Sequence, residues 1–157
     1  MPIKAHFQTL FAYQGAMYQR LLDCAALLDE ATYQQKQPYR MGSLHDILFH
    51  VLYWHNLWRV GLEGDSNYGG FQAQDFADLA ALRTGIHNEQ REWQRVLADL
   101  HDNAFEEEQS VLGVTAPRWR ILQHLILHSM QHHSEAAALL TAKGYSPNSI
   151  DFIWYTG

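Results

Sequence analysis

The sequence is poor in cysteine, in basic residues and in long apolar runs. Its one cysteine, Cys24, has no partner for an internal disulfide, and the first residues lack the basic start and unbroken apolar stretch of a secretory signal. Polar or charged residues interrupt every hydrophobic stretch before it reaches the ~18 residues that suggest a membrane-spanning helix. We therefore expect a soluble protein of the reducing cytoplasm with no membrane partner.

Positive charge is also scarce. Lysine and arginine together number 11, against 17 aspartates and glutamates, and the formal net charge is -6. A protein whose main partner is a nucleic-acid backbone usually gathers basic residues on one face or along one stripe. The sequence has no such stripe, which argues against nucleic acid as a partner.

Apolar residues at helical spacing are abundant. Of the 157 residues, 47% are hydrophobic, enough for the core of one compact domain. Four segments repeat apolar residues at intervals of three and four, at about 3–29, 43–63, 75–100 and 115–143. The connections are too short for a second domain, and period-two alternation is confined to a stretch near 109–114. We predict an all-α, antiparallel four-helix bundle that forms a single domain over residues 1–157.

Capping residues mark the ends of these segments. Ser43, followed three residues later by Asp46, has the spacing of a capping box. Thr115 is predicted to cap the last helix, with Pro117 in its first turn, and Gly144 is predicted to end that helix.

Histidine is the residue present in excess. There are ten, and His124, His128, His132 and His133 fall within ten consecutive positions. At about 100° per residue, His128 and His132 share the apolar arc of the last helix, one turn apart, so both rings can converge on one ion. His50 lies on the apolar stripe of the second helix. His124 is at the edge of the arc and about 12 Å along the helix from His132, so we leave it out of the set.

The spacing alone leaves two interpretations open, because backbone carbonyls often satisfy a core histidine without any metal. Three inward imidazoles in one small bundle favour a metal, since burying them without partners costs several kcal/mol in total. With no second cysteine and no carboxylate at a convincing fourth position, one coordination position is left for water or substrate, as in catalytic sites. His45 and His55 project to either side of the His50 stripe, and we expect them at the helix margins or surface.

Acidic and aromatic side chains accompany these histidines. Glu135, three residues after His132, is our candidate catalytic residue as a general base; the alternatives are an acceptor for a ligand ring and a solvated acid at the bundle mouth. Asp46 either accepts the free ring N–H of His50 or serves only as the capping acid. Aromatic residues flanking His50 either pack in the core or wall a small-molecule pocket. They are Tyr53, Trp54 and Trp58.

Two segments resemble one known family. Residues 124–155, HLILHSMQHHSEAAALLTAKGYSPNSIDFIWY, are similar to the last helix and tail of the DinB-like proteins, and residues 43–64, SLHDILFHVLYWHNLWRVGLEG, are similar to their second helix. The resemblance extends to helix order and loops, and so to nearly the whole chain. It implies a metal triad of His50, His128 and His132. One departure is that residues 133–135 read HSE, where many members have Arg, Gly and Gln.

The resemblance also implies a class of function. Members are divalent-metal proteins, usually dimeric, and include S-transferases and isomerases that use low-molecular-weight thiols, although many have no known activity. It thus implies a metal-dependent thiol S-transferase acting on a small-molecule substrate, with a divalent ion (Zn, Ni or Fe) and a low-molecular-weight thiol as cofactors. The alternatives are a non-catalytic, stress-related metal-binding protein and a metal-dependent hydrolase. Three imidazoles suit zinc, nickel, iron and copper alike, so the ligand set does not choose the ion.

A second apolar face on the last helix bears on assembly. Leu122, Ile126, Ala137 and Leu140 lie away from the histidine arc. If one face packs inside the bundle, the other can bury against a second copy through an isologous contact. We therefore expect a homodimer.

Overall fold

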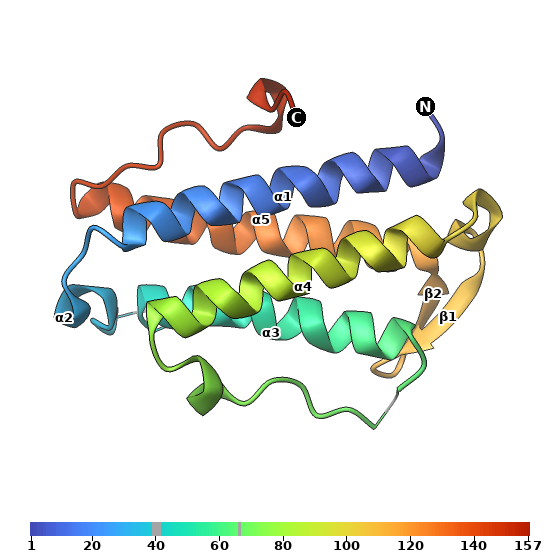
Figure 1. Ribbon diagram of the computed structural model, residues 1–157, viewed down its shortest axis with the longest axis horizontal. Coiled ribbons are helices and arrows are strands. Elements are labelled where there is room, and N and C mark those ends of the chain that lie inside the picture. Colours follow the sequence, from blue (N-terminus) through green and yellow to red (C-terminus); the bar gives the residue numbers. More distant parts are fainter. Residues whose placement is uncertain (39–41, 66) are drawn as a thin grey trace.

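The computed structural model describes residues 1–38, 42–65 and 67–157. These residues form five α-helices and a two-stranded sheet (Figure 1). The helices are α1 (Ile3–Ala25), α2 (Glu30–Tyr33), α3 (Leu44–Leu62), α4 (Leu79–Asp99) and α5 (Arg118–Ala142). The strands are β1 (Glu108–Val111) and β2 (Val114–Pro117), and the 3-10 turns are η1 (Ala73–Phe76), η2 (Asp102–Phe105) and η3 (Phe152–Trp154). Within the described ranges no helix combines the length and apolar character needed to cross a membrane.

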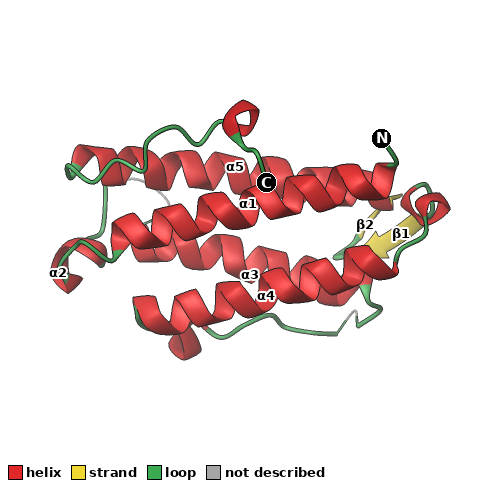
Figure 2. Ribbon diagram, turned by 45° about the horizontal axis from the view of Figure 1, so that its top comes forward, coloured by secondary structure: helices red, strands yellow, loops and turns green. Residues whose placement is uncertain are grey.

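Four long helices lie side by side, with α1 and α3 each packed against both α4 and α5 (Figures 1 and 2). The Lys4 backbone N–H at the start of α1 donates to the Asp102 carboxylate just after α4 (3.3 Å). The Gln109 side chain of β1 donates to the Leu62 carbonyl oxygen at the end of α3 (3.2 Å). α1 and α5 thus begin at the end of the molecule that carries the strands, whereas α3 and α4 finish there (Figure 1).

The connection between α3 and α4 explains these directions. Residues 63–78, of which residue 66 is not described, return along the length of the helices (Figure 1). An extended segment of this length reaches up to about 50 Å, more than the roughly 28 Å length of the 19-residue helix α3. The expected antiparallel packing therefore holds between α1 and α4 and between α3 and α5, but α3 and α4 run in the same direction.

Side-chain caps set the starts of α3 and α4. The Ser43 hydroxyl accepts from the Asp46 N–H (3.1 Å), and the Asp46 carboxylate accepts from the Ser43 N–H (2.6 Å), so the predicted capping box is confirmed. α4 begins after Asp78, whose carboxylate accepts from the Ala81 N–H (2.8 Å). The predicted start at residue 75 is too early, because that residue lies in η1.

Residues 108–117 form an antiparallel hairpin, where the sequence predicts only a short extended stretch near 109–114. Leu112 and Gly113 both have positive φ, 52° and 78°, which makes the two-residue connection a primed turn suited to strand twist. Thr115 and Pro117 therefore lie in β2, and the prediction that Thr115 caps the last helix with Pro117 in its first turn is wrong. A proline that begins a helix and one that ends a strand have the same local restriction on φ, so the sequence pattern did not separate them.

The hairpin closes one end of the helices. Val111, which is almost fully buried, packs on Gly61 near the end of α3. A Cβ atom at Gly61 would lie only 2.4 Å from a Val111 methyl carbon. The absence of a side chain at Gly61 thus allows β1 to lie directly on α3 and fixes where α3 ends relative to β2 and α5.

The apolar face of α5 that suggested a dimer is buried inside the chain. Leu122 and Leu140 have no exposed area and Ile126 is buried as well, because α5 packs against α1 on one side and α3 on another. The argument for a dimer from this face is therefore wrong. A homodimer remains a prediction that rests on the family resemblance.

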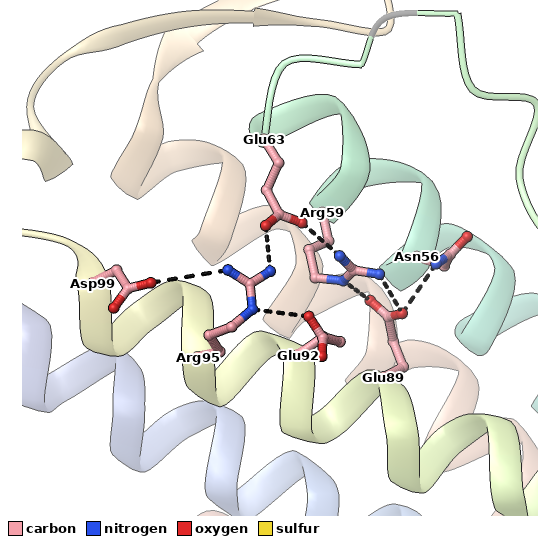
Figure 3. Close-up of polar contacts among 7 residues, drawn as sticks. All are labelled: Asn56, Arg59, Glu63, Glu89, Glu92, Arg95 and Asp99. Atoms are coloured by element: carbon pink, nitrogen blue, oxygen red, sulfur yellow. Dashed lines mark hydrogen bonds and ion pairs between the residues drawn. The ribbon is translucent and has the colours of Figure 1, made fainter.

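Ionic contacts link α3 to α4 (Figure 3). The Arg59 guanidinium of α3 donates to both carboxylate oxygens of Glu89 in α4, at 2.6 and 3.0 Å, and Asn56 donates to the same carboxylate at 3.0 Å. Arg59 also reaches Glu63, which Arg95 of α4 contacts from the solvent side. Because Glu89 is buried, its negative charge depends on this paired guanidinium.

Candidate metal centre

Three histidines from two helices meet between α3 and α5. His50 comes from the first half of α3, and His128 and His132 come from the middle of α5, one turn apart. The Nε2 atom of His128 lies 3.2 Å from the Nε2 atom of His50 and 3.2 Å from that of His132. One ligand atom from each ring lies within 4.8 Å of the others. These are the three residues that the sequence analysis selected.

The geometry fits a metal ion. Nitrogen ligands at about 2.0–2.1 Å from a tetrahedral ion are roughly 3.3–3.4 Å apart. Two of the three Nε2 pairs, both involving His128, come close to this separation at 3.2 Å. The three imidazoles could therefore hold one divalent ion with little movement of the backbone.

The protonation state of His128 also suits a metal ligand. His132 is 4% exposed, and His50 and His128 are partly buried. Burial, and then the neighbouring rings of His132 and His50, lower the pKa of His128 to about 4. At neutral pH this ring is uncharged and carries the lone pair that a metal ligand must offer.

Glu135 fixes the orientation of one ligand ring. Its carboxylate lies 2.8 Å from Nδ1 of His132. An ionised carboxylate only accepts hydrogen bonds, so Nδ1–H donates to Glu135, and Nε2 presents its lone pair to the site. The structure thus places Glu135 behind His132, in the acceptor role given above as an alternative. Its role as a general base stays a prediction.

Other residues that the sequence predicts near the triad have contacts of their own. His124 is exposed, packs edge-on against Trp58, and lies outside the cluster of three. Asp46 serves the capping box and accepts from Lys36 (2.5 Å). Trp54 packs edge-on against His50, with ring centroids 6.1 Å apart.

The other two aromatic residues of the predicted group pack against other parts of the structure. Trp58 is 8% exposed and belongs to the apolar core toward the hairpin. Tyr53 packs on Trp54 and against Gly70, where a Cβ atom would come within 2.5 Å of its ring. Of the predicted pocket wall, Trp54 is the member with a described contact to a triad ring.

Sequence reasoning missed the burial of His45 and His133 and the hydrogen bond that His55 makes inside the bundle. His45 is 9% exposed and hydrogen-bonds with the Tyr33 hydroxyl (2.9 Å), and His55 hydrogen-bonds with the Ser129 hydroxyl (2.5 Å). His133 is 1% exposed. The expectation that His45 lies at the helix margin or surface is therefore wrong, whereas His55 is partly exposed. The signal was available for His133, which follows Ile126 by seven positions on the α5 stripe first interpreted as a dimer face.

In comparisons with known proteins, one family model matches this sequence. The sequence model described as the DinB family matches residues 1–157, the whole chain. No curated protein matches the chain.

Buried histidines make the stability of the metal-free protein depend on pH. Burial, and then the nearby His133 and His128, lower the pKa of His55 from 6.5 to about 3. Between these values the unfolded chain binds a proton that the folded chain does not, so the stabilisation present above pH 6.5 is lost as the pH falls. From about pH 7.5 to about pH 5 we expect the free energy of unfolding to fall by about 1–2 kcal/mol through this residue. Urea denaturation in EDTA measures it.

Two variants test whether His55 causes this pH dependence of the unfolding free energy. His55→Gln keeps a polar side chain near Ser129 but removes the titrating ring, so its unfolding free energy should fall less on acidification. His87→Gln, at an exposed position of α4, is the matched control and should behave as the wild type. An unchanged pH dependence in His55→Gln would contradict the assignment.

Proposed function

The chain belongs to the DinB family, and on that premise we propose that it is a metal-dependent thiol S-transferase whose divalent ion is held by His50, His128 and His132. The observation that carries the proposal is the convergence of one ligand atom from each of these rings within 4.8 Å. The substrate class is a small molecule. The proposal includes the family's four-helix bundle as one domain, which the packing of α1 and α3 on the same two helices supports.

Each part of the site has a distinct task in this proposal. α5 supplies two ligands one turn apart, and α3 supplies the third from 78 positions earlier in the sequence. Glu135 holds the His132 ring in the tautomer whose Nε2 is free to bind. The fourth coordination position is left to a ligand from solution.

The ligand set favours an anionic partner at that position. Three neutral imidazoles do not offset the charge of a divalent ion, and the ion when bound lowers the pKa of a water or thiol that ligates it. Trp54 lies beside His50 and can exclude water and contact the apolar part of a substrate. Thiol transfer is preferred to hydrolysis on the resemblance to thiol-dependent relatives, and the same resemblance supports a homodimer.

A second candidate function is non-catalytic metal binding. The observation that favours it is the position of the triad, because an ion there cross-links α3 to α5 through side chains far apart in the sequence. Such an ion would stabilise the fold by a free energy that grows with the logarithm of its affinity for the folded chain.

Replacement of single histidines tests the ligand assignment. His128→Ala should lower the affinity for Zn²⁺ at least about tenfold, because it removes a direct ligand. His124→Ala is the matched control, since it removes an exposed imidazole one turn away from His128 on the same helix. Competition with a chromogenic chelator measures both affinities. An equal loss in the two variants would mean that the α5 pair is wrongly assigned.

The open coordination position is tested with cobalt and a thiol. We expect Co²⁺-loaded protein titrated with a small thiol to develop a sulfur-to-metal charge-transfer band, and His128→Ala to lack it. Active thiols are then screened with electrophilic acceptors for transfer. If no thiol produces a band and the ion has four protein ligands, the transferase proposal fails and the non-catalytic function takes its place.

A further inference from the structure

Buried polar side chains outside the triad border a cavity that is separate from the triad, and we call it the second cavity. This cavity has a volume of about 420 Å³ and lies between α1 and α4, with α3 and α5 behind it. None of the three triad histidines is among its described lining residues. Its polar and aromatic lining includes Gln14, Tyr18, His55, Trp93, Ser129 and His133.

Three of these side chains carry hydrogen-bonding groups that no described residue satisfies. Gln14 donates through Nε2 to the Ile126 carbonyl oxygen (2.8 Å), which leaves its own carbonyl oxygen without a partner. The Trp93 indole N–H and both ring nitrogens of His133 also lack partners within the described chain. The exposed fractions of these side chains are 4% for Gln14, 2% for Trp93 and 1% for His133.

This set is unusual because buried polar groups in folded proteins nearly always have a partner. Here the residues that carry the unpaired groups come from α1, α4 and α5, and all three line the same cavity. Together they offer an acceptor at Gln14, a donor at Trp93, and one of each at the neutral His133 ring. An occupant that presents both a donor and an acceptor would satisfy groups that the fold leaves unmet.

The walls indicate the shape of the occupant. Phe11 and Trp93 pack with ring centroids 4.8 Å apart, and Tyr18 packs on His133 at 4.9 Å. Flat aromatic walls of this kind suit a planar molecule that stacks or packs edge-on. The cavity volume lies in the range of small-molecule pockets.

The charges indicate a neutral occupant. Glu89 is the one Asp, Glu, Lys or Arg among the described lining residues, and the Arg59 guanidinium already pairs with both of its oxygens. An ion placed in the cavity would therefore have no free counter-charge, and its desolvation would oppose binding.

Small side chains keep the mouth open. Ala12 and Ala16 lie one turn apart on the exposed side of α1, opposite Gln90 and Gln94 of α4. At Gly15, between them, a Cβ atom would come within 3.0 Å of the Gln90 amide. Because Ala12 and Ala16 are exposed lining residues, the cavity reaches the surface between α1 and α4.

We propose that this cavity is a second, metal-independent binding site for a neutral planar heterocycle with a cyclic amide edge. The ring N–H of such a molecule matches the free acceptor of Gln14, and its carbonyl oxygen, which can accept two hydrogen bonds, matches the indole N–H of Trp93 and the ring N–H of His133. The proposal does not depend on the thiol-transfer function, because the cavity and the triad share no described lining residue.

Calorimetric titration of the full-length, metal-containing protein tests the site. The probes are 2-quinolinone and isoquinolin-1-one, and N-methyl-2-quinolinone serves as the control because it keeps the carbonyl but lacks the N–H. We expect saturable binding of at least one lactam, with the methylated control at least about tenfold weaker. Binding should persist in His128→Ala, which separates this site from the metal centre. No saturable binding of either lactam, as expected if only ordered water fills the cavity, overturns the proposal.

Two variants and one control variant locate the binding. Ala16→Trp blocks the mouth from an exposed position and should abolish lactam binding, whereas Ala138→Trp, at an exposed position of α5 away from the cavity, should not. His133→Phe replaces the unpaired ring by an apolar one, so it should raise the unfolding temperature and weaken lactam binding at least about tenfold while the metal content stays unchanged. Equal binding in the wild type and Ala16→Trp overturns the proposal, as does a His133→Phe variant that is less stable yet binds normally.

Discussion

The antiparallel contact of α3 with α5 is the constraint on which the candidate site depends. It places His50 opposite an H-x-x-x-H pair, so that two of the Nε2 separations are 3.2 Å. A shift of α3 along α5 by a single turn, about 5.4 Å, would remove His50 from the cluster. The hairpin opposes such a shift, because Val111 packs on Gly61 at the end of α3 and β2 leads directly into α5. The packing of the hairpin at one end of the molecule therefore determines whether the three histidines meet near its middle.

Buried polar groups in this protein differ in the partners that they have. Glu89 is paired with Arg59 and Asn56, so its charge is compensated within the fold. The triad histidines bring one ligand atom each within 4.8 Å of the others, an arrangement that suits one shared divalent ion. The groups around the second cavity are left unsatisfied by the described chain. The binding site proposed at this second cavity thus lies where polar atoms lack partners within the described chain.

Periodicity and capping patterns predicted a substantial part of this structure. They gave the four long helices, the capping box of Ser43 and Asp46, and the inward direction of His128 and His132. These features depend on residues close in sequence. The crossover between α3 and α4 was not predictable in the same way, because an apolar stripe has no direction and the connection is long enough for either topology.

The other errors have specific physical causes. The strands of the hairpin have only four residues each, too few for a convincing alternation, and Pro117 fits a strand end as well as a helix start. His133 was missed because α5 was assumed to bury one face, whereas it packs against both α1 and α3. The most direct test of the central claim is metal analysis and X-ray absorption spectroscopy on protein purified without a histidine tag. The account predicts about one divalent ion per chain with three imidazole ligands. A protein that binds no divalent ion, or one whose ion has fewer than three imidazole ligands, would contradict it.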